Sequence, residues 1–307
     1  MIARIFQQED LNFLLTNRIP RRAATRLLGW LSRLESPLLV AASLRIWKLF
    51  APELDLSESR TRRFRSLREC FIRELAPGAR PVAADPHVLV SPCDAVVGAC
   101  GRAHDALAIQ AKGLRYRLAE LLGGEAPAAR HRDGLFVTLR LKSTMYHRFH
   151  APAACRLREV THIAGDTWNV NPIALKRVER LFCRNERAVL PLELEGGGAL
   201  TLVAIAAIGV ATLRLHCLSA ALGLRYAGPT RIPCDARYEK GQELGWFEQG
   251  STIVVLASGD LALADGVREG RTLRVGEPLL IASNARPHER SGRAGGAAEG
   301  FAAPAGG

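Results

Sequence analysis

Near the beginning of the chain, apolar and basic residues repeat with the period of a helix. On a 3.6-residue wheel, one arc is apolar and consists of Ala24, Leu27, Leu28, Leu31 and Leu34. The opposite arc is basic and consists of Arg22, Arg26 and Arg33, with Trp30 at the boundary. This division is typical of a helix that lies in a membrane interface. A helical hairpin packed on its own domain would give a similar pattern, so both interpretations stay open.

A second apolar stretch follows Pro37 and runs from Leu38 to Phe50. After Pro77-Gly78 the pattern changes to short Val, Leu and Ile runs that are separated by Gly, Pro and Asp, which is typical of strands. Two further helices are expected, at residues 114–122 and 173–182. We therefore predict an α+β fold in which an N-terminal amphipathic helical region is followed by a β-rich domain.

The domain boundaries follow from the same changes in pattern. We place the helical region at residues 1–75 and the β-rich domain at residues 76–285. Residues 286–307 are rich in Gly, Ala and Arg and have no periodicity, so we predict a disordered C-terminal tail.

Charge and composition restrict the class of partner. The 307 residues carry a net charge of +12, mostly from arginine, which favours a nucleic acid, an anionic membrane or a phosphorylated substrate. Aromatic residues make up only 6% of the chain, and its arginines follow an amphipathic pattern, so a nucleic-acid partner is not expected. No apolar run reaches the ~18 residues of a spanning helix, so any contact with a membrane is predicted to be peripheral.

The cysteines give no sign of a disulfide framework or of a metal site. Their number, seven, is odd, and no Cys-x-x-Cys pair occurs. We expect reduced thiols, a cytoplasmic compartment and no bound metal.

Three segments carry residues that suit catalysis. An acid, Asp94, ends an apolar run; His147 and His150 stand three positions apart; and Gly250-Ser251 precedes the apolar run that begins at Thr252. A serine hydroxyl can attack a carbonyl carbon when a base removes its proton. Each segment alone also fits an ordinary turn, loop or core histidine.

The order Asp, His, Ser also occurs in serine hydrolases, so a hydrolase is one alternative. However, Ser251 does not lie in a Gly-x-Ser-x-Gly turn. A non-enzymatic, β-rich membrane-binding module with decayed motifs is a second alternative, and the retained Asp94, His150 and Ser251 argue against it.

The segments together resemble bacterial phosphatidylserine decarboxylases from about Phe71 to Leu279. The resemblance rests on the order and spacing of the motifs at residues 71–81, 91–94, 111–123, 146–152, 170–172, 185–187 and 241–252. Three positions depart from the family pattern. Ala95 replaces a glycine, Met145 replaces an aspartate, and Gln249 replaces a leucine before the Gly-Ser pair.

The resemblance implies an enzyme that decarboxylates phosphatidylserine to phosphatidylethanolamine and CO2. It implies autocatalytic cleavage between Gly250 and Ser251, and conversion of Ser251 into a covalent pyruvoyl (pyruvic acid) cofactor that forms a Schiff base with the substrate. Asp94, His150 and Ser251 are the implied catalytic residues. In this reading Asp94 orients His150, the base for Ser251, while His147 is the implied substrate-binding residue.

The resemblance also implies where the protein acts and with what. The partner is phosphatidylserine in an anionic membrane, and the enzyme is peripheral on the cytoplasmic face of the cell membrane. The cleaved long and short chains remain together as a heterodimer. The sequence leaves open whether a homo-oligomer forms as well.

Overall fold

The structure is a computed structural model, and it describes residues 9–111, 113–209, 212–248 and 252–283. The predicted scissile pair, Gly250-Ser251, and the predicted tail, 286–307, lie outside the described residues.

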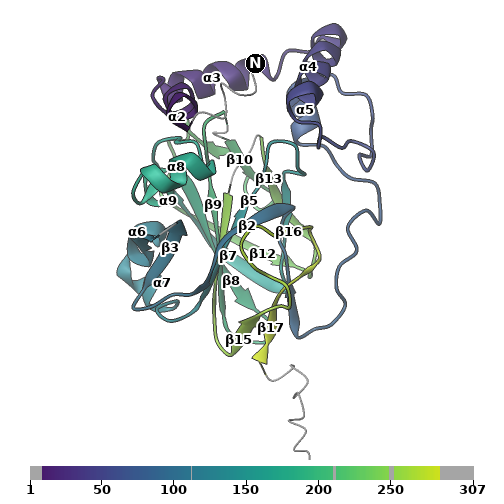
Figure 1. Cartoon of the computed structure of the whole chain (residues 1–307). Helices are drawn as coiled ribbons and strands as arrows, with labels where there is room; N and C mark the ends of the chain where they lie inside the picture. Colours follow the sequence, from purple (N-terminus) through teal and green to yellow (C-terminus); the bar gives the residue numbers. More distant parts are fainter. Residues whose placement is uncertain (1–8, 112, 210–211, 249–251, 284–307) are drawn as a thin grey trace, which may run out of the picture.

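Within the described residues, the N-terminal region has four helices, which gather at one end of the molecule (Figure 1). They are α2 (Glu9–Asn17), α3 (Arg21–Leu31), α4 (Pro37–Phe50) and α5 (Leu67–Phe71). The sequence sets where α4 and α5 begin, because the Ser36 and Ser66 side chains accept hydrogen bonds from backbone N–H groups of the first turn. Pro37 then takes the first position of α4, where no intrahelical partner for an N–H is needed.

One side of helix α3 contacts the β-rich domain. Arg21 forms an ion pair with Asp166 at 2.6 Å, and the buried Thr25 hydroxyl accepts a hydrogen bond from the Gly209 backbone at 3.0 Å. Part of the predicted apolar arc faces outward instead: Leu27 is 56% exposed and Trp30 60% exposed. None of the described helices is long and apolar enough to cross a membrane.

Antiparallel strands make up the rest of the fold. The largest sheet has eight strands in the order β12-β7-β8-β9-β14-β5-β2-β16, and a four-stranded sheet has the order β11-β10-β13-β6. A three-stranded sheet, β1-β17-β15, and the hairpin β3-β4 complete the set. The strand bounds are β1 Val88–Val90, β2 Ala95–Arg102, β3 Leu107–Ala111, β4 Leu114–Arg117, β5 Leu135–Arg140, β6 Arg148–His150, β7 Cys155–Ile163, β8 Arg187–Leu194, β9 Ala199–Ile205, β10 Thr212–Leu215, β11 Leu222–Gly223, β12 Arg231–Tyr238, β13 Glu243–Phe247, β14 Thr252–Ser258, β15 Leu261–Leu263, β16 Thr272–Leu273 and β17 Pro278–Ala282.

The eight-stranded sheet is covered on both faces, so its central strands are mostly apolar on both faces. In β14, Ile253 and Val255 contribute to the core shared with the four-stranded sheet, where Phe149 and Phe247 pack. Residues of the opposite parity, such as Val254, join a second core under the short helices α6 (Leu118–Leu122), α7 (Glu125–Ala129), α8 (Pro172–Arg177) and α9 (Leu181–Arg184). Strand β14, which follows the predicted cleavage site, is therefore held at the centre of the molecule.

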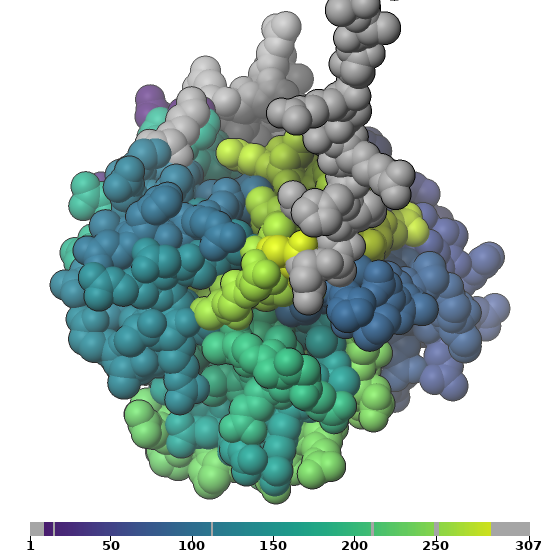
Figure 2. Space-filling model, turned by 90° about the horizontal axis from the view of Figure 1, so that it is seen from below, coloured from purple at the N-terminus to yellow at the C-terminus, as the bar shows by residue number. Residues whose placement is uncertain are grey.

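The two ends of the β-rich domain meet. Strand β1 pairs with β17, and β17 pairs with β15. Figure 2 views this side from below, where the yellow C-terminal strands lie against blue segments from the first half of the chain.

The α+β class is confirmed, and the helices predicted within the β-rich domain need correction. Residues 114–117 are strand β4, paired with β3, and only 118–122 are helical. Burial alternates along this segment as in a strand, because Tyr116 is buried while Arg115 and Arg117 are exposed. The helix predicted at 173–182 is two short helices interrupted near Arg180, whose φ of 53° is left-handed.

Candidate active site

Asp94 lies in a buried turn between β1 and β2 and is held by two partners. Arg80 donates to both of its carboxylate oxygens, from Nε at 2.9 Å and from Nη2 at 2.5 Å. The backbone N–H of Val275 donates to Oδ1 at 2.9 Å. Arg80 also pairs with Glu58 at 2.8 Å, so the aspartate belongs to a network that is mostly withdrawn from solvent. These charge-assisted hydrogen bonds hold the carboxylate in one orientation.

His150 stands in β6 beside this turn, because its backbone N–H donates to the Pro92 carbonyl at 2.8 Å. Its ring Nδ1 lies 2.9 Å from the Gly241 carbonyl oxygen, which can only accept, so Nδ1 carries the proton. Nε2 is therefore the basic nitrogen, and the Tyr146 hydroxyl lies 3.1 Å from it. Burial lowers the pKa of His150, while the Gly241 carbonyl, Glu243 and Asp94 oppose that shift. The ring is thus neutral near pH 7, as a general base must be.

This geometry corrects one part of the sequence-based picture. The resemblance implies that Asp94 fixes the tautomer and orientation of His150, in the manner of a hydrolytic triad. In the part of the chain that the structure describes, the Gly241 carbonyl does so, and the hydrogen bonds of Asp94 go to Arg80 and Val275. The influence of Asp94 on His150 is that of a nearby negative charge.

His147 is more deeply buried than His150, with no exposed surface. Its Nδ1 donates to the Met145 carbonyl at 2.8 Å, which leaves Nε2 as a buried acceptor without a partner among the described residues. Burial, followed by the positive charge of Arg73, lowers the pKa of His147 to about 3. Such orphaned buried atoms are uncommon in proteins and often mark a functional position.

The pairing of β6 with β13 places the two histidines relative to the cleavage segment. Glu243 lies opposite His150, and at the other end Phe247 donates its backbone N–H to the His147 carbonyl at 3.0 Å. The chain continues from Phe247 to Glu248, and β14 begins at Thr252. His147 is therefore the histidine whose strand position is nearer to the segment 249–251.

A pocket of about 480 Å³ opens next to the beginning of β14. Arg140, which lies opposite Thr252, forms part of its wall, as do Phe71 and Thr144. Phe71 also packs edge-on against His147, with ring centroids 5.5 Å apart. The Val170-Asn171 motif lines the far side, where Asn171 caps α8 by accepting from the Ala174 N–H. Leu28 of α3 closes the pocket toward the N-terminal region.

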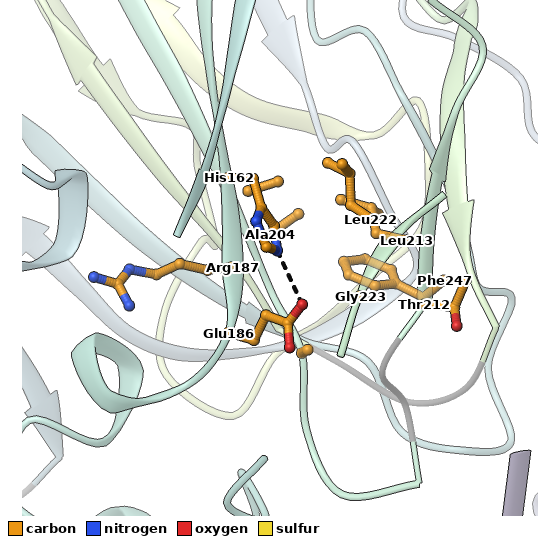
Figure 3. Close-up of a pocket in the computed structure, with 11 residues that line it drawn as sticks. His162, Glu186, Arg187, Ala204, Thr212, Leu213, Leu222, Gly223 and Phe247 are labelled. Atoms are coloured by element: carbon orange, nitrogen blue, oxygen red, sulfur yellow. Dashed lines mark hydrogen bonds and ion pairs between the residues drawn. The ribbon is translucent and has the colours of Figure 1, made fainter. Parts of the chain in front are cut away.

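Another motif, Asn185-Glu186-Arg187, contributes Glu186 and Arg187 to the wall of a separate and much smaller cavity of about 20 Å³, room for about one water molecule. In Figure 3 His162 points toward Glu186, 2.9 Å away, and Arg187 points away from both. Arg187 donates instead to carbonyl oxygens of Leu121 and Cys183. These motif residues join strands and helices, and we assign them a structural role.

Sequence reasoning missed several polar partners of the site. Arg80 and Tyr146 lie inside segments that resemble the family motifs, and this position was the signal that could have identified them as site residues. The Gly241 carbonyl could not be found in this way, since it is a backbone atom 91 positions from His150. Glu248 was also missed; it is buried and accepts from Arg68 at 2.6 Å and from Arg33 at 3.1 Å.

The fold and site define a β-rich protein with a buried acid, a buried neutral histidine and a half-buried neutral histidine, an arrangement suited to proton transfer. Comparison with known proteins gives the family. The family model for phosphatidylserine decarboxylase matches residues 67–281. The chain is similar to the phosphatidylserine decarboxylase proenzyme of Brevibacillus brevis, with 36% identity over 269 residues, covering 86% of this chain and 95% of the relative.

Two further relatives carry the same description. The proenzyme of Anaeromyxobacter sp. is 38% identical over 85% of this chain and 94% of its own length. That of Halorhodospira halophila is 42% identical over 74% and 78%, respectively. The chain belongs to the phosphatidylserine decarboxylase family, and the prediction of a decarboxylase is confirmed.

Proposed function

We propose that this chain is a phosphatidylserine decarboxylase proenzyme that cuts itself between Gly250 and Ser251. The observation that carries the proposal is the neutral, half-buried His150, which keeps a basic Nε2 in a chain that also retains the Gly-Ser pair before β14. The family match adds the substrate, because the relatives are described as phosphatidylserine decarboxylase proenzymes.

Maturation begins when His150 Nε2 removes the proton from Ser251 Oγ. The oxygen attacks the Gly250 carbonyl carbon, the peptide C–N bond breaks, and His150 returns the proton to the departing amine, which leaves an ester. Loss of the Ser251 α-proton then breaks the Oγ–Cβ bond. The Gly250 carboxylate is released, and residue 251 becomes a dehydroalanine. One water molecule hydrolyses this group to a pyruvoyl group and ammonia.

The pyruvoyl group, when present, supplies an electron sink for the electrons released with CO2. The residues described around its expected position suit such a group. Thr252, with which β14 begins, is fully buried, and its hydroxyl has no partner among the described residues. His147 Nε2 is a second buried polar atom without a described partner. Both groups can take up a hydrogen bond that the described proenzyme leaves unmade.

His147 is assigned to the substrate. Because its ring is neutral, Nε2 can take a proton from the substrate ammonium group and later return it to the carbon that has lost CO2. The substrate reaches this atom only after a rearrangement, because the ring has no exposed surface and Phe71 packs against it. The 480 Å³ pocket has Arg140 and Lys142 in its wall as cations for the phosphate, and Lys142 also pairs with Glu53 at 3.9 Å.

The enzyme is proposed to act while bound to the cytoplasmic face of the cell membrane. Support comes from large apolar side chains that α3 and α4 expose beside basic ones: Trp30 is 60% exposed, Leu38 84% and Leu49 78%. Basic residues near an anionic bilayer add about 1 kcal/mol each. After cleavage the long and short chains stay together as a heterodimer, since β14 is hydrogen-bonded to β5 and β9 of the long chain.

Denaturing electrophoresis and intact mass test the proposal. Cleavage before Ser251 leaves 307 − 250 = 57 residues in the short chain, or roughly 6 kDa by scaling the chain mass. The wild type should show two fragments, and the mass of the short one should fit a pyruvoyl N-terminus. Ser251→Ala should stay one chain. An active wild-type protein that remains uncut would overturn the self-processing mechanism.

A further inference from the structure

A second cavity, of about 310 Å³, lies between α3 and the β10–β11 hairpin. It is distinct from the pocket beside β14, with which it shares Gly209. Its wall combines Arg26, Trp30 and Arg33, from α3 and the turn after it, with Arg214 of β10 and Arg225, which follows β11. The cavity thus joins the N-terminal region to the β-rich domain.

The charges around this cavity are unbalanced. Four arginines and one carboxylate, Glu248, line it, which leaves an excess of 4 − 1 = 3 positive charges. Glu248 is already bound by Arg33 and by Arg68. Within the described ranges, no carboxylate forms an ion pair with Arg26, Arg214 or Arg225. Guanidinium groups in one wall repel one another unless an anion binds between them.

The abundance of arginine alone does not explain this imbalance. Another cavity, of about 530 Å³, is lined by five arginines, but four of them form ion pairs with acids and the fifth, Arg73, donates to backbone carbonyl oxygens. Arg60 pairs with Glu74, and Arg65 pairs with Glu69. The cavity between α3 and β10–β11 differs because three of its guanidinium groups have their hydrogen-bonding forks uncommitted to an acid, as a phosphate site requires.

The rim of the cavity is apolar on the outward side. Trp30 lines the cavity and is 60% exposed, and Leu27, three residues earlier on α3, is 56% exposed. A tryptophan between an apolar surface and a polar one is typical of the membrane interface. A ligand that fits both features carries a phosphate for the arginines and hydrocarbon for the α3 surface.

We propose that this cavity binds the phosphate of an anionic phospholipid that is not the molecule undergoing decarboxylation. The inference rests on the proposed membrane contact and adds a specific lipid site to it. The phosphodiester lies among Arg26, Arg214 and Arg225, and the acyl chains follow Leu27 and Trp30 into the bilayer. The bound lipid thereby fixes the β-rich domain, as well as α3, to the membrane surface.

The test measures binding to phosphatidylcholine vesicles that contain phosphatidylglycerol, a lipid that is not a substrate. It uses the full chain carrying Ser251→Ala, so the result does not depend on self-cleavage. Arg214→Ala/Arg225→Ala should raise the dissociation constant by about thirtyfold. The matched control is Arg115→Ala/Arg237→Ala, which removes the same net charge from exposed sites that do not line the cavity. This control pair should change the dissociation constant less than about threefold, because charges farther than about 8–10 Å from the membrane surface are largely screened by salt.

A conservative pair separates local binding from overall charge and from misfolding. Arg214→Lys/Arg225→Lys keeps the charge but loses the planar fork, so an intermediate loss is expected. Equal losses in the cavity and control pairs would overturn the proposal, as would unchanged binding of the cavity pair. Soluble glycerol 3-phosphate should bind far more weakly than vesicles; equally tight binding would make this a site for a soluble phosphate and reject the lipid.

Discussion

Arg80 forms a bidentate ion pair with Asp94, in which Nε and Nη2 donate to the two carboxylate oxygens at 2.9 and 2.5 Å. The two side chains are 11% and 9% exposed, so this ion pair is largely shielded from water. Because the hydrogen bonds of Asp94 go to Arg80 and Val275, its effect on His150 is electrostatic. Arg80 therefore influences how strongly the negative charge of Asp94 acts on His150.

Replacement of Arg80 by alanine should stop or greatly slow self-cleavage. A buried carboxylate that loses its partner costs about 3–5 kcal/mol of stability, and Asp94 also loses the group that holds it in place near His150. Arg80→Lys keeps one charge and should retain partial cleavage. The measurement is the time course of proenzyme loss on a denaturing gel, with thermal unfolding as the folding control. A folded Arg80→Ala protein that matures at the wild-type rate would contradict the argument.

The two histidines should fail at different stages. His150→Ala and Asp94→Ala should accumulate uncut proenzyme, since the base or its charge partner is lost. His147→Ala should be cut and should then decarboxylate about 10²–10⁴-fold more slowly, the usual contribution of a general acid or base. Gel analysis and CO2 release from phosphatidylserine vesicles separate the stages.

The strand register means that the comparison between the His147 and His150 variants can have either outcome. Because the His147 carbonyl accepts from Phe247, close to the cleavage segment, the reverse outcome is physically reasonable. If His147→Ala blocks cleavage while His150→Ala permits it, the roles are exchanged. If neither affects cleavage, the base lies elsewhere.

How far the sequence could predict the site depends on the kind of contact. Asp94, His147 and His150 were identified because each lies in a short motif whose order resembles that of a family. Arg80 lay in such a motif as well, but its pairing with Asp94 depends on the chain between them, which pattern does not reveal. The Gly241 carbonyl leaves no mark in the sequence, because any residue offers that atom.

The same limit explains the error in the fold. The nine residues 114–122, which mix apolar residues with two arginines and a glutamate, fit a helix or a strand followed by a helix. Hairpin pairing decided the matter, because Tyr116 enters the core when β4 pairs with β3. The helical wheel of α3 was more informative, since the division between an apolar arc with Leu27 and a basic arc with Arg26 predicts a different environment for each arc. That the apolar arc contacts a membrane stays a prediction.

Membrane binding should depend on the outward apolar residues of α3. Leu27→Ser/Trp30→Ser should weaken binding to anionic vesicles at least tenfold, because full burial of one such side chain contributes about 1.5–3 kcal/mol. Stability should change by less than about 1 kcal/mol, since both side chains are exposed. Ile109→Ser, at a 41% exposed position of β3, is the matched control and should bind as wild type does. Equal binding by all three proteins would limit α3 to a scaffold role.

Buried histidines should make the proenzyme less stable in mild acid. Burial lowers the pKa of His131 to about 4 and that of His147 to about 3. The unfolded chain, with a histidine pKa near 6.5, therefore binds more protons than the fold between these values. Stability is complete above pH 6.5 and falls as the pH drops, by up to about 1.4 kcal/mol per pH unit for each histidine. Urea unfolding of the Ser251→Ala protein at pH 7.5, 6 and 5 measures the slope.

His131→Gln gives the control for that slope. His131 lies away from the site, between Ser258 and Thr201, so an amide can replace part of its hydrogen bonding. The variant should lose about one histidine's share of the dependence between pH 6.5 and 5. An unchanged slope would mean that His131 is protonated in the fold.

Glu248 should prove necessary for efficient cleavage although it takes no part in the chemistry. It precedes Gly250 by two residues, and Arg68 and Arg33 of the N-terminal region hold its carboxylate, which is 10% exposed. Glu248→Gln keeps the shape but weakens two charge-assisted hydrogen bonds, at a cost of about 1–3 kcal/mol, so the scissile segment is positioned less well. We expect cleavage to slow by about tenfold or more, while molecules that have been cut decarboxylate normally per pyruvoyl group. Glu193→Gln, in an exposed pair with Arg158, should mature at the wild-type rate. Wild-type maturation of Glu248→Gln would show that the N-terminal region does not position the cleavage segment through this carboxylate.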